Sequence, residues 1–258
     1  MIPEKIHLIA PSIDKWHPLW IPCYDSWHNN YDTVITWNDN SDLRKLVKDH
    51  LPEFLELYDK LPCHMMQIDF AKFAILYHAG GVYVDLDVFN YKNFHAELTG
   101  DLYFLEAGYG DYPIENAIVC SSRKNRHIYN VMLEIQRRFI AKPLSFPLSH
   151  EDNEYILSTT GPHMLSEYYK NNNSIKTLSC LEYNNHGLSY NKKFKTKHLL
   201  TGVWGKDDLK APGLLATDYK NRVKKVTSID IDIDNFSFYK DYTKGNYLKN
   251  KKVNLNYA

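Results

Sequence analysis

A glycine pair, an apolar run and two aspartates constrain this chain more than any other feature. The segment reads Gly80-Gly81-Val82-Tyr83-Val84-Asp85-Leu86-Asp87. Apolar residues recur at helical spacing over 62–78, and the glycine pair is a typical end for that helix. The apolar run that follows predicts a buried strand over 82–88. Because side chains alternate along a strand, we expect Asp85 and Asp87 to share one face.

Two carboxylates at one strand end predict a metal site. Mg²⁺ and Mn²⁺ take hard oxygen ligands and keep positions open for phosphate oxygens and water, so a diphosphate could bind there. A bare Asp-x-Asp is more often a solvated turn, but here apolar residues flank both acids and the glycine pair allows a close approach by another backbone or a ligand. A rival set, Asp230, Asp232 and Asp234, alternates with isoleucines and predicts a solvated edge strand instead.

Helices that alternate with strands along the chain predict an α/β fold with a mostly parallel sheet. The expected strands cover 6–9, 33–37, 82–88, 102–105 and 117–120. The expected helices begin after a cap at Ser41, span 62–78 and 126–140, and follow Thr160-Gly161-Pro162. We expect one domain over 1–210 and an irregular C-terminal extension over 211–258 that packs on it or frays.

Composition and charge argue against several classes of protein. The 258 residues include 31 basic and 31 acidic side chains, so no charge excess favours nucleic acid or an anionic membrane. The 4 cysteines lie far apart with no CxxC pair, which predicts reduced thiols and a cytoplasmic location. No signal peptide and no apolar run of about 20 residues is visible, so we expect a soluble protein without an integral membrane segment. The oligomeric state stays open.

The run from 67 to 88 resembles the signature of glycosyltransferase family thirty-two, the DXD sugar-binding region. That family includes fungal initiating α-mannosyltransferases, α1,4-galactosyltransferases, many capsule enzymes and, distantly, the large glucosylating toxins. The residues that match in order and spacing are Asp69, Gly80, Gly81, Tyr83, Asp85 and Asp87. Residues 2–7 are similar to the family's first strand, and 198–204 to a His-rich stretch that ends in Gly-x-Trp. Two shorter similarities are Asn116-Ala117-Ile118 to the central strand and Thr160-Gly161-Pro162 to a later turn.

The resemblance implies a GT-A-like α/β domain and a retaining, metal-dependent hexosyltransferase. Its donor would be a nucleotide-diphosphate sugar, with a UDP-sugar favoured over GDP-mannose, and its acceptor a glycan or another hydroxyl compound. The implied catalytic residues are Lys72, Asp85 and Asp87. The implied substrate-binding residues are Asp69, Lys72, Gly80, Gly81, Tyr83, Asp85 and Trp204. The implied ligands of Mn²⁺ or Mg²⁺ are Asp87, Asp85 and His198.

The implied roles differ between these residues. Asp69 would bind sugar hydroxyls, Lys72 would lie by the sugar or diphosphate, and Asp87 would bind the metal directly. Asp85 would contact the ribose, the sugar or a metal-bound water. Trp204 would lie over the diphosphate or the sugar, with packing in the core as the other interpretation.

Two positions depart from the family pattern. Lys72 stands where the family has arginine, which keeps the charge but loses the bidentate fork. Ala10 stands where an aromatic residue often closes the first strand. Stacking on the base would therefore come from Trp16, Trp27 or Trp37, or be absent.

Other interpretations stay open at this stage. Paired aspartates near a strand end also occur in metal-dependent phosphohydrolases and nucleotidyltransferases, although no GxxxxGK[ST] phosphate loop is present. A sugar-nucleotide-binding protein with weak catalysis is a third class. Asp69 and Lys72, three residues apart on one helix face, could also be an ordinary surface ion pair.

Overall fold

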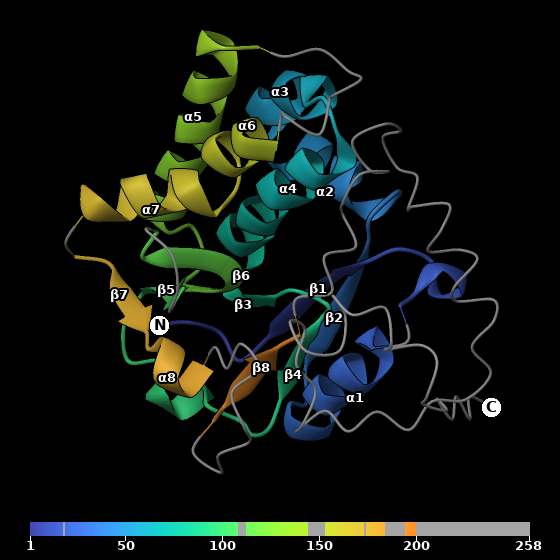
Figure 1. Ribbon diagram of the computed structural model, residues 1–258. Helices are drawn as coiled ribbons and strands as arrows, with labels where there is room; N and C mark the ends of the chain where they lie inside the picture. Colours follow the sequence, from blue (N-terminus) through green and yellow to red (C-terminus); the bar gives the residue numbers. More distant parts are fainter. Residues whose placement is uncertain (18, 108–111, 144–152, 173, 184–193, 200–258) are drawn as a thin grey trace, which may run out of the picture.

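The computed structural model describes residues 1–17, 19–107, 112–143, 153–172, 174–183 and 194–199. A six-stranded sheet in the order β2-β1-β3-β6-β5-β7 runs through this part of the chain (Figure 1). Its strands are β1 (Ile6–Ala10), β2 (Val34–Asn38), β3 (Gly81–Val84), β5 (Leu102–Glu106), β6 (Ile114–Ser121) and β7 (Lys176–Leu178). Only β6 opposes its neighbours; the β1–β2, β1–β3 and β5–β7 pairs are parallel. The expected α/β fold with a mostly parallel sheet is confirmed.

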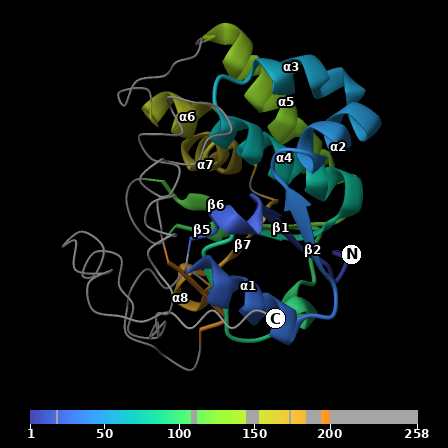
Figure 2. The ribbon, with the colours of Figure 1, turned by 90° about the vertical axis from the view of Figure 1, so that its right-hand side faces the viewer.

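Helices cover both faces of this sheet. They are α1 (Trp20–Asn30), α2 (Asp42–His50), α3 (Leu55–Lys60), α4 (His64–Ala79), α5 (Arg126–Ala141), α6 (Asn153–Thr159), α7 (Pro162–Lys170) and α8 (Cys180–Tyr183). Short 3₁₀ turns lie at Ile13–Lys15, Pro52–Phe54 and His95–Glu97. Helices α2 to α7 lie on one face, whereas α1, α8 and a small antiparallel sheet of β4 (Val88–Asn90) and β8 (Thr196–His198) lie on the other (Figures 1 and 2). The expected GT-A-like layering, a sheet between helices, is therefore present.

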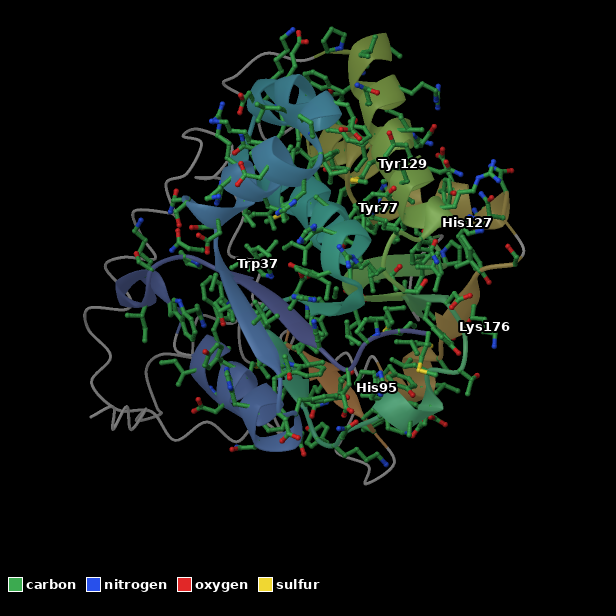
Figure 3. The ribbon with its side chains drawn as sticks, turned by 180° about the vertical axis from the view of Figure 1, so that it is seen from behind. Trp37, Tyr77, His95, His127, Tyr129 and Lys176 are labelled. Carbon is green, nitrogen blue, oxygen red and sulfur yellow. The ribbon has the colours of Figure 1, made fainter. Side chains whose placement is uncertain are left out.

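Helix α4 is the buried centre of the upper layer. Most of its apolar residues are buried, including Phe70, Phe73 and Ile75, and they occupy all sides of the helix, as expected for a helix enclosed by other elements. Tyr77 of α4 and Tyr129 of α5 hold these helices together with ring centroids 5.2 Å apart (Figure 3). Charged residues on α4 are therefore placed inside the protein.

The expected strand over 82–88 is wrong in its second half. Strand β3 ends at Val84, and the chain leaves the large sheet through a turn closed by the Val88 N–H, which donates to the Asp85 carbonyl at 3.1 Å. The next strand, β4, pairs with β8 in the other sheet. Ser41 does precede α2, but its hydroxyl donates to Asn38 Oδ1 at 3.2 Å and does not cap the helix.

The glycine pair has a backbone function at the start of β3. Gly80 and Gly81 have φ angles of +66° and +111°, where other residues are strained. A Cβ on Gly81 would lie 2.6 Å from the Lys5 carbonyl oxygen. The pair thus lets α4 turn into β3 against the segment that enters β1. Of the two partners expected for the glycine pair, a backbone or a ligand, the structure shows the backbone.

The described helices include none that is long and apolar enough to pass through a lipid bilayer. The four cysteines, which all lie in the described part of the chain, form no disulfide: Cys23, Cys63, Cys120 and Cys180. The C-terminal extension expected over 211–258 lies outside the described residues.

Candidate active site

The turn after β3 brings Asp85 and Asp87 together where the two sheets diverge. Asp85 faces α4, where the Lys72 Nζ lies 3.5 Å from its Oδ1. Asp87 faces β8, where the His198 Nε2 lies 3.2 Å from its Oδ1. The two acids therefore connect the upper layer of the protein to the lower one, and strand alternation is not what aligns them.

Asp85, Asp87 and His198 form a possible metal site. One ligand atom from each lies within 4.8 Å of the others, as required of groups that share one ion about 2.0–2.6 Å from each of them. The Asp85 side chain is 29% exposed, whereas those of Asp87 and His198 are 13% and 10% exposed. The set is thus open to a ligand on the Asp85 side.

The charges around this set also suit a divalent cation. In the described part of the chain, four carboxylates gather here against the two basic groups of Lys72 and His198. The carboxylates are those of Asp69, Asp85, Asp87 and Glu115. Burial raises the pKa of Asp85, Lys72 opposes this rise, and the charge of Asp87 adds to it. A bound cation would offset the excess negative charge.

His198 lies between two acids. Its Nδ1 is 2.7 Å from Glu115 Oε1, on the opposite side of the ring from Asp87. Burial alone would lower the pKa of His198, but the charges of Asp87 and Glu115 outweigh it and hold the pKa well above its ordinary value. The ring is thus fixed in one orientation between β6 and the turn.

Lys72 is a buried cation, which excludes the interpretation as a surface ion pair. The residue is 2% exposed, and its Nζ lies 3.0 Å from Asp69 Oδ1 and 5.0 Å from the centroid of the Tyr83 ring. Burial lowers the pKa of Lys72, but the charges of Asp85 and Asp69 raise it above its ordinary value. The Tyr83 hydroxyl donates to Asp85 Oδ1 at 2.9 Å. Tyr83 therefore orients Asp85 while its ring covers the ammonium.

Asp69 is held by two residues to which the sequence had assigned no role in the site. Asn116 Nδ2 donates to its Oδ1 at 3.0 Å, and the Thr160 hydroxyl donates to its Oδ2 at 2.9 Å. Both residues lie in stretches that resemble the family, which was the available signal. Glu115 was missed too, and its signal was a lone acid at the start of an apolar strand. Asn116 and Thr160 thus connect β6 and the segment before α7 to α4, whereas Glu115 connects β6 to β8.

Residues 19–104 match the family model described as a glycosyltransferase sugar-binding region containing a DXD motif. Residues 19–104 thus carry the DXD sugar-binding region of glycosyltransferases. The matched range includes Asp69, Lys72 and the Asp85–Asp87 turn, whereas Glu115, Asn116, Thr160 and His198 lie beyond it. The DXD glycosyltransferase region expected from the motif is thereby confirmed.

Curated relatives agree with this assignment. An uncharacterized glycosyltransferase of Acanthamoeba polyphaga mimivirus is 28% identical over 179 residues, which cover 60% of this chain and 65% of that protein. Inositol phosphoceramide mannosyltransferase 3 of Schizosaccharomyces pombe is 37% identical over 90 residues, or 34% of this chain and 24% of that protein. This chain thus aligns with less than two thirds of the length of either relative. Among solved structures, the PaToxG glycosyltransferase superposes with a TM-score of 0.49 at 14% identity, covering 67% of this chain and 71% of that one.

Not every expected site residue lies at this turn. Gly80 ends α4 and Gly81 begins β3, at the other end of the strand and about 13 Å away at the usual rise of a strand. Their contacts are with Lys5, Pro3 and Arg123, so the geometry gives them packing and not substrate contact. Trp204, and the rival acids at 230, 232 and 234, lie outside the described residues.

The tryptophans considered for base stacking are engaged in the fold. Trp27 is fully buried, and its Nε1 donates to the Val88 carbonyl at 2.8 Å, so its ring is not available to a base. Trp16 is 7% exposed and donates to the Pro11 carbonyl at 2.9 Å. Trp37 is itself a residue of β2 (Figure 3), and its Nε1 donates to His7 Nδ1.

Proposed function

We propose that this domain transfers a hexose from a nucleotide-diphosphate sugar to a hydroxyl acceptor, in a divalent-metal-dependent reaction that retains the anomeric configuration. The observation that carries the proposal is the arrangement at the end of β3. There a possible metal site of two aspartates and a histidine adjoins a buried lysine–aspartate pair. A diphosphate needs a cation, and a sugar needs fixed hydrogen-bonding groups beside it.

Each residue has a role that follows from its contacts. Asp87 and His198, the two more buried ligands, would bind Mn²⁺ or Mg²⁺ on the side of β8. Asp85 would complete the set on the more exposed side. Lys72 would place its positive charge beside the departing diphosphate. Asp69, oriented by Asn116 and Thr160, would bind sugar hydroxyls with its remaining lone pairs. When bound, the cation supplies charge stabilisation for the leaving diphosphate.

Retention of the anomeric configuration can come from a direct reaction between donor and acceptor, without a nucleophile from the described residues. Asp69 and Asp85 are paired with Lys72. Asp87 and Glu115 are paired with His198. In an internal-return route, the bond between the anomeric carbon and the phosphate oxygen breaks, and the acceptor oxygen bonds to that carbon on the same face. The acceptor proton then passes to the phosphate oxygen that has left. The protein contributes orientation and charge, with Lys72 as the fixed cation.

Two donors are the ones to compare. The resemblance favours a UDP-hexose, whereas the mannosyltransferase named among the relatives supports GDP-mannose as the second arm. Both share the diphosphate chemistry that the turn fits. A panel with UDP-glucose, UDP-galactose and GDP-mannose therefore tests the reaction class without a known acceptor, because water can replace it.

Loss of Asp87 should abolish turnover and leave the fold intact. We expect Asp87→Asn to lower donor cleavage with Mn²⁺ at least about 100-fold, because a direct ligand should matter no less than an outer residue, whose loss costs up to about 100-fold. The measurement is release of nucleoside diphosphate, with melting temperature recorded beside it. Asp49→Asn, on the exposed face of α2, is the control and should cleave donor at the wild-type rate. Undiminished turnover in excess chelator would contradict the metal requirement.

A further inference from the structure

We infer that Glu115 is a positioning residue for the metal site: it holds His198 so that one ring nitrogen faces Asp87 and the bound cation. The inference rests on the proposed function, since it assigns a role toward the proposed metal. It concerns a residue outside the matched DXD region. Glu115 acts through His198 and does not contact the cation itself.

The geometry is a chain of three side chains from three elements. Glu115 is the second residue of β6, His198 ends β8, and Asp87 lies in the turn after β3. Glu115 Oε1 lies 2.7 Å from His198 Nδ1, and His198 Nε2 lies 3.2 Å from Asp87 Oδ1. The side chains of Glu115 and His198 are 8% and 10% exposed. The imidazole is therefore held from both sides with little access of water.

An irregularity in β6 places Glu115 there. Leu105 of β5 pairs with Glu115, while the preceding Phe104 pairs with Val119, so the register shifts between them. Such bulges re-aim side chains next to functional sites. Here Glu115 points to β8, and its neighbour Asn116, as the next residue of the strand, points to Asp69 on the opposite face of the sheet. One short stretch thus supplies a buried polar group to each side of the turn.

The chemistry of imidazole explains how Glu115 would affect metal binding through His198. A carboxylate at Nδ1 keeps a proton on that nitrogen, which leaves the lone pair of Nε2 directed at the cation and makes it a better donor. Loss of such an outer carboxylate typically weakens metal binding about 10- to 100-fold. Without the carboxylate the ring could rotate or take the other tautomer.

The test is Mn²⁺ affinity of the full chain, measured by electron paramagnetic resonance of free Mn²⁺ during titration. We expect Glu115→Ala to weaken binding toward the 100-fold end of that range, because both the orientation and the charge are lost. Glu115→Gln keeps an acceptor oxygen for Nδ1 and should lose about tenfold. Glu106→Gln, a half-buried acid on the adjacent strand β5, is the matched control and should bind as the wild type does.

A double-mutant cycle separates positioning from a general effect. If Glu115 acts through His198, Glu115→Ala adds less than about twofold in a His198→Ala background, since interacting residues are not additive. Pulsed resonance of bound Mn²⁺ gives a second readout: the ¹⁴N coupling of a coordinated imidazole should be present in the wild type, absent in His198→Ala and weakened or absent in Glu115→Ala.

The outcomes distinguish this inference from the proposed function. Wild-type chain that binds no Mn²⁺ would overturn both. Weaker binding in Asp87→Asn and His198→Ala, with Glu115→Ala and Glu115→Gln unchanged, would overturn the inference alone. An equal loss from Glu115→Ala in both backgrounds would also overturn it, because Glu115 would then act independently of His198. If Glu115→Ala does not fold, Glu115→Gln decides, and unchanged affinity counts against the inference.

Discussion

At position 72, a lysine lies 2% exposed between Asp69 and Asp85. A buried charge is tolerated only where it is paired and hydrogen-bonded, and here the Tyr83 ring adds a cation–π contact. The sequence predicted the charge at this position but not its burial. Whether a helix residue is enclosed depends on the elements that pack over it, which were not visible in a single segment.

Removal of the Lys72 charge should damage stability and activity together. We expect Lys72→Met to lower the free energy of unfolding by about 3–5 kcal/mol, because the buried carboxylate of Asp69 and the partly exposed one of Asp85 both lose their partner. It should also lower kcat/KM for the donor roughly 10- to 100-fold, the value of a charged hydrogen bond. Lys72→Arg keeps the charge and should recover most of both. Lys45→Met, at an exposed pair, is the control; a wild-type melting temperature for Lys72→Met would contradict the buried-pair account.

Protonation of His7 should lower the stability of the protein in mild acid. Its Nδ1 accepts from Trp37 Nε1 at 3.2 Å, so its Nε2 must carry the proton that is donated to the Gly80 carbonyl at 2.8 Å. Burial lowers its pKa to about 4. Since this lies below the unfolded value of 6.5, the unfolded chain takes up the proton first as the pH falls.

The stability contribution of neutral His7 is therefore present above pH 6.5 and is lost as the pH falls toward 4. We expect a decrease of up to about 3 kcal/mol across this window. Urea unfolding of the wild type and His7→Gln between pH 7.5 and 4 measures it. The His7→Gln curve should be flatter, and equal slopes would show that another group is responsible.

At the scale of elements, the segment from α4 to β4 shows where sequence reasoning succeeds and where it stops. Helical spacing and the glycine pair predicted α4 and the start of β3, because both signals are local. The turn at Asp85–Asp87 could not be predicted, since the alternating pattern continues through it to Val88. The change of sheet is imposed by β8 and the residue after it, since the Leu199 N–H donates to the Asp87 carbonyl at 2.9 Å from more than 100 positions away.

The glycine pair should prove structural. Gly81→Ala meets both a positive φ and the Lys5 carbonyl, so we expect a loss of about 1–3 kcal/mol of stability. Mn²⁺ affinity of the folded protein should not change, because the turn lies at the other end of β3. Gly100→Ala is the control, since its new Cβ would meet only side-chain atoms of Lys176 and Tyr103. Weaker Mn²⁺ binding by Gly81→Ala at unchanged stability would instead place the pair in the site.

At the scale of the whole molecule, the site joins the two layers. Its residues come from α4, the turn after β3, β6, the connection between α6 and α7, and β8, so positions 69 to 198 must converge. Resemblance identified the contiguous DXD part, but Glu115, Asn116 and Thr160 become neighbours only through the sheet order β3-β6-β5 and the packing of α7. A site built this way is assembled only in the folded protein.

A ligand that bridges the two layers should therefore raise the melting temperature, and should need the cation to do so. At a concentration 100 times its dissociation constant, a donor that binds only the folded state adds about 2.7 kcal/mol, which corresponds to a rise of roughly 5–10 °C for a domain of this size. We expect this rise with UDP-hexose or GDP-mannose plus Mn²⁺, and little with either alone. Asp87→Asn should abolish it, because the diphosphate loses its cation. If the melting temperature rises as much in excess chelator as it does with Mn²⁺, the nucleotide binds away from the turn. That conclusion would hold even if the protein still cleaved its donor.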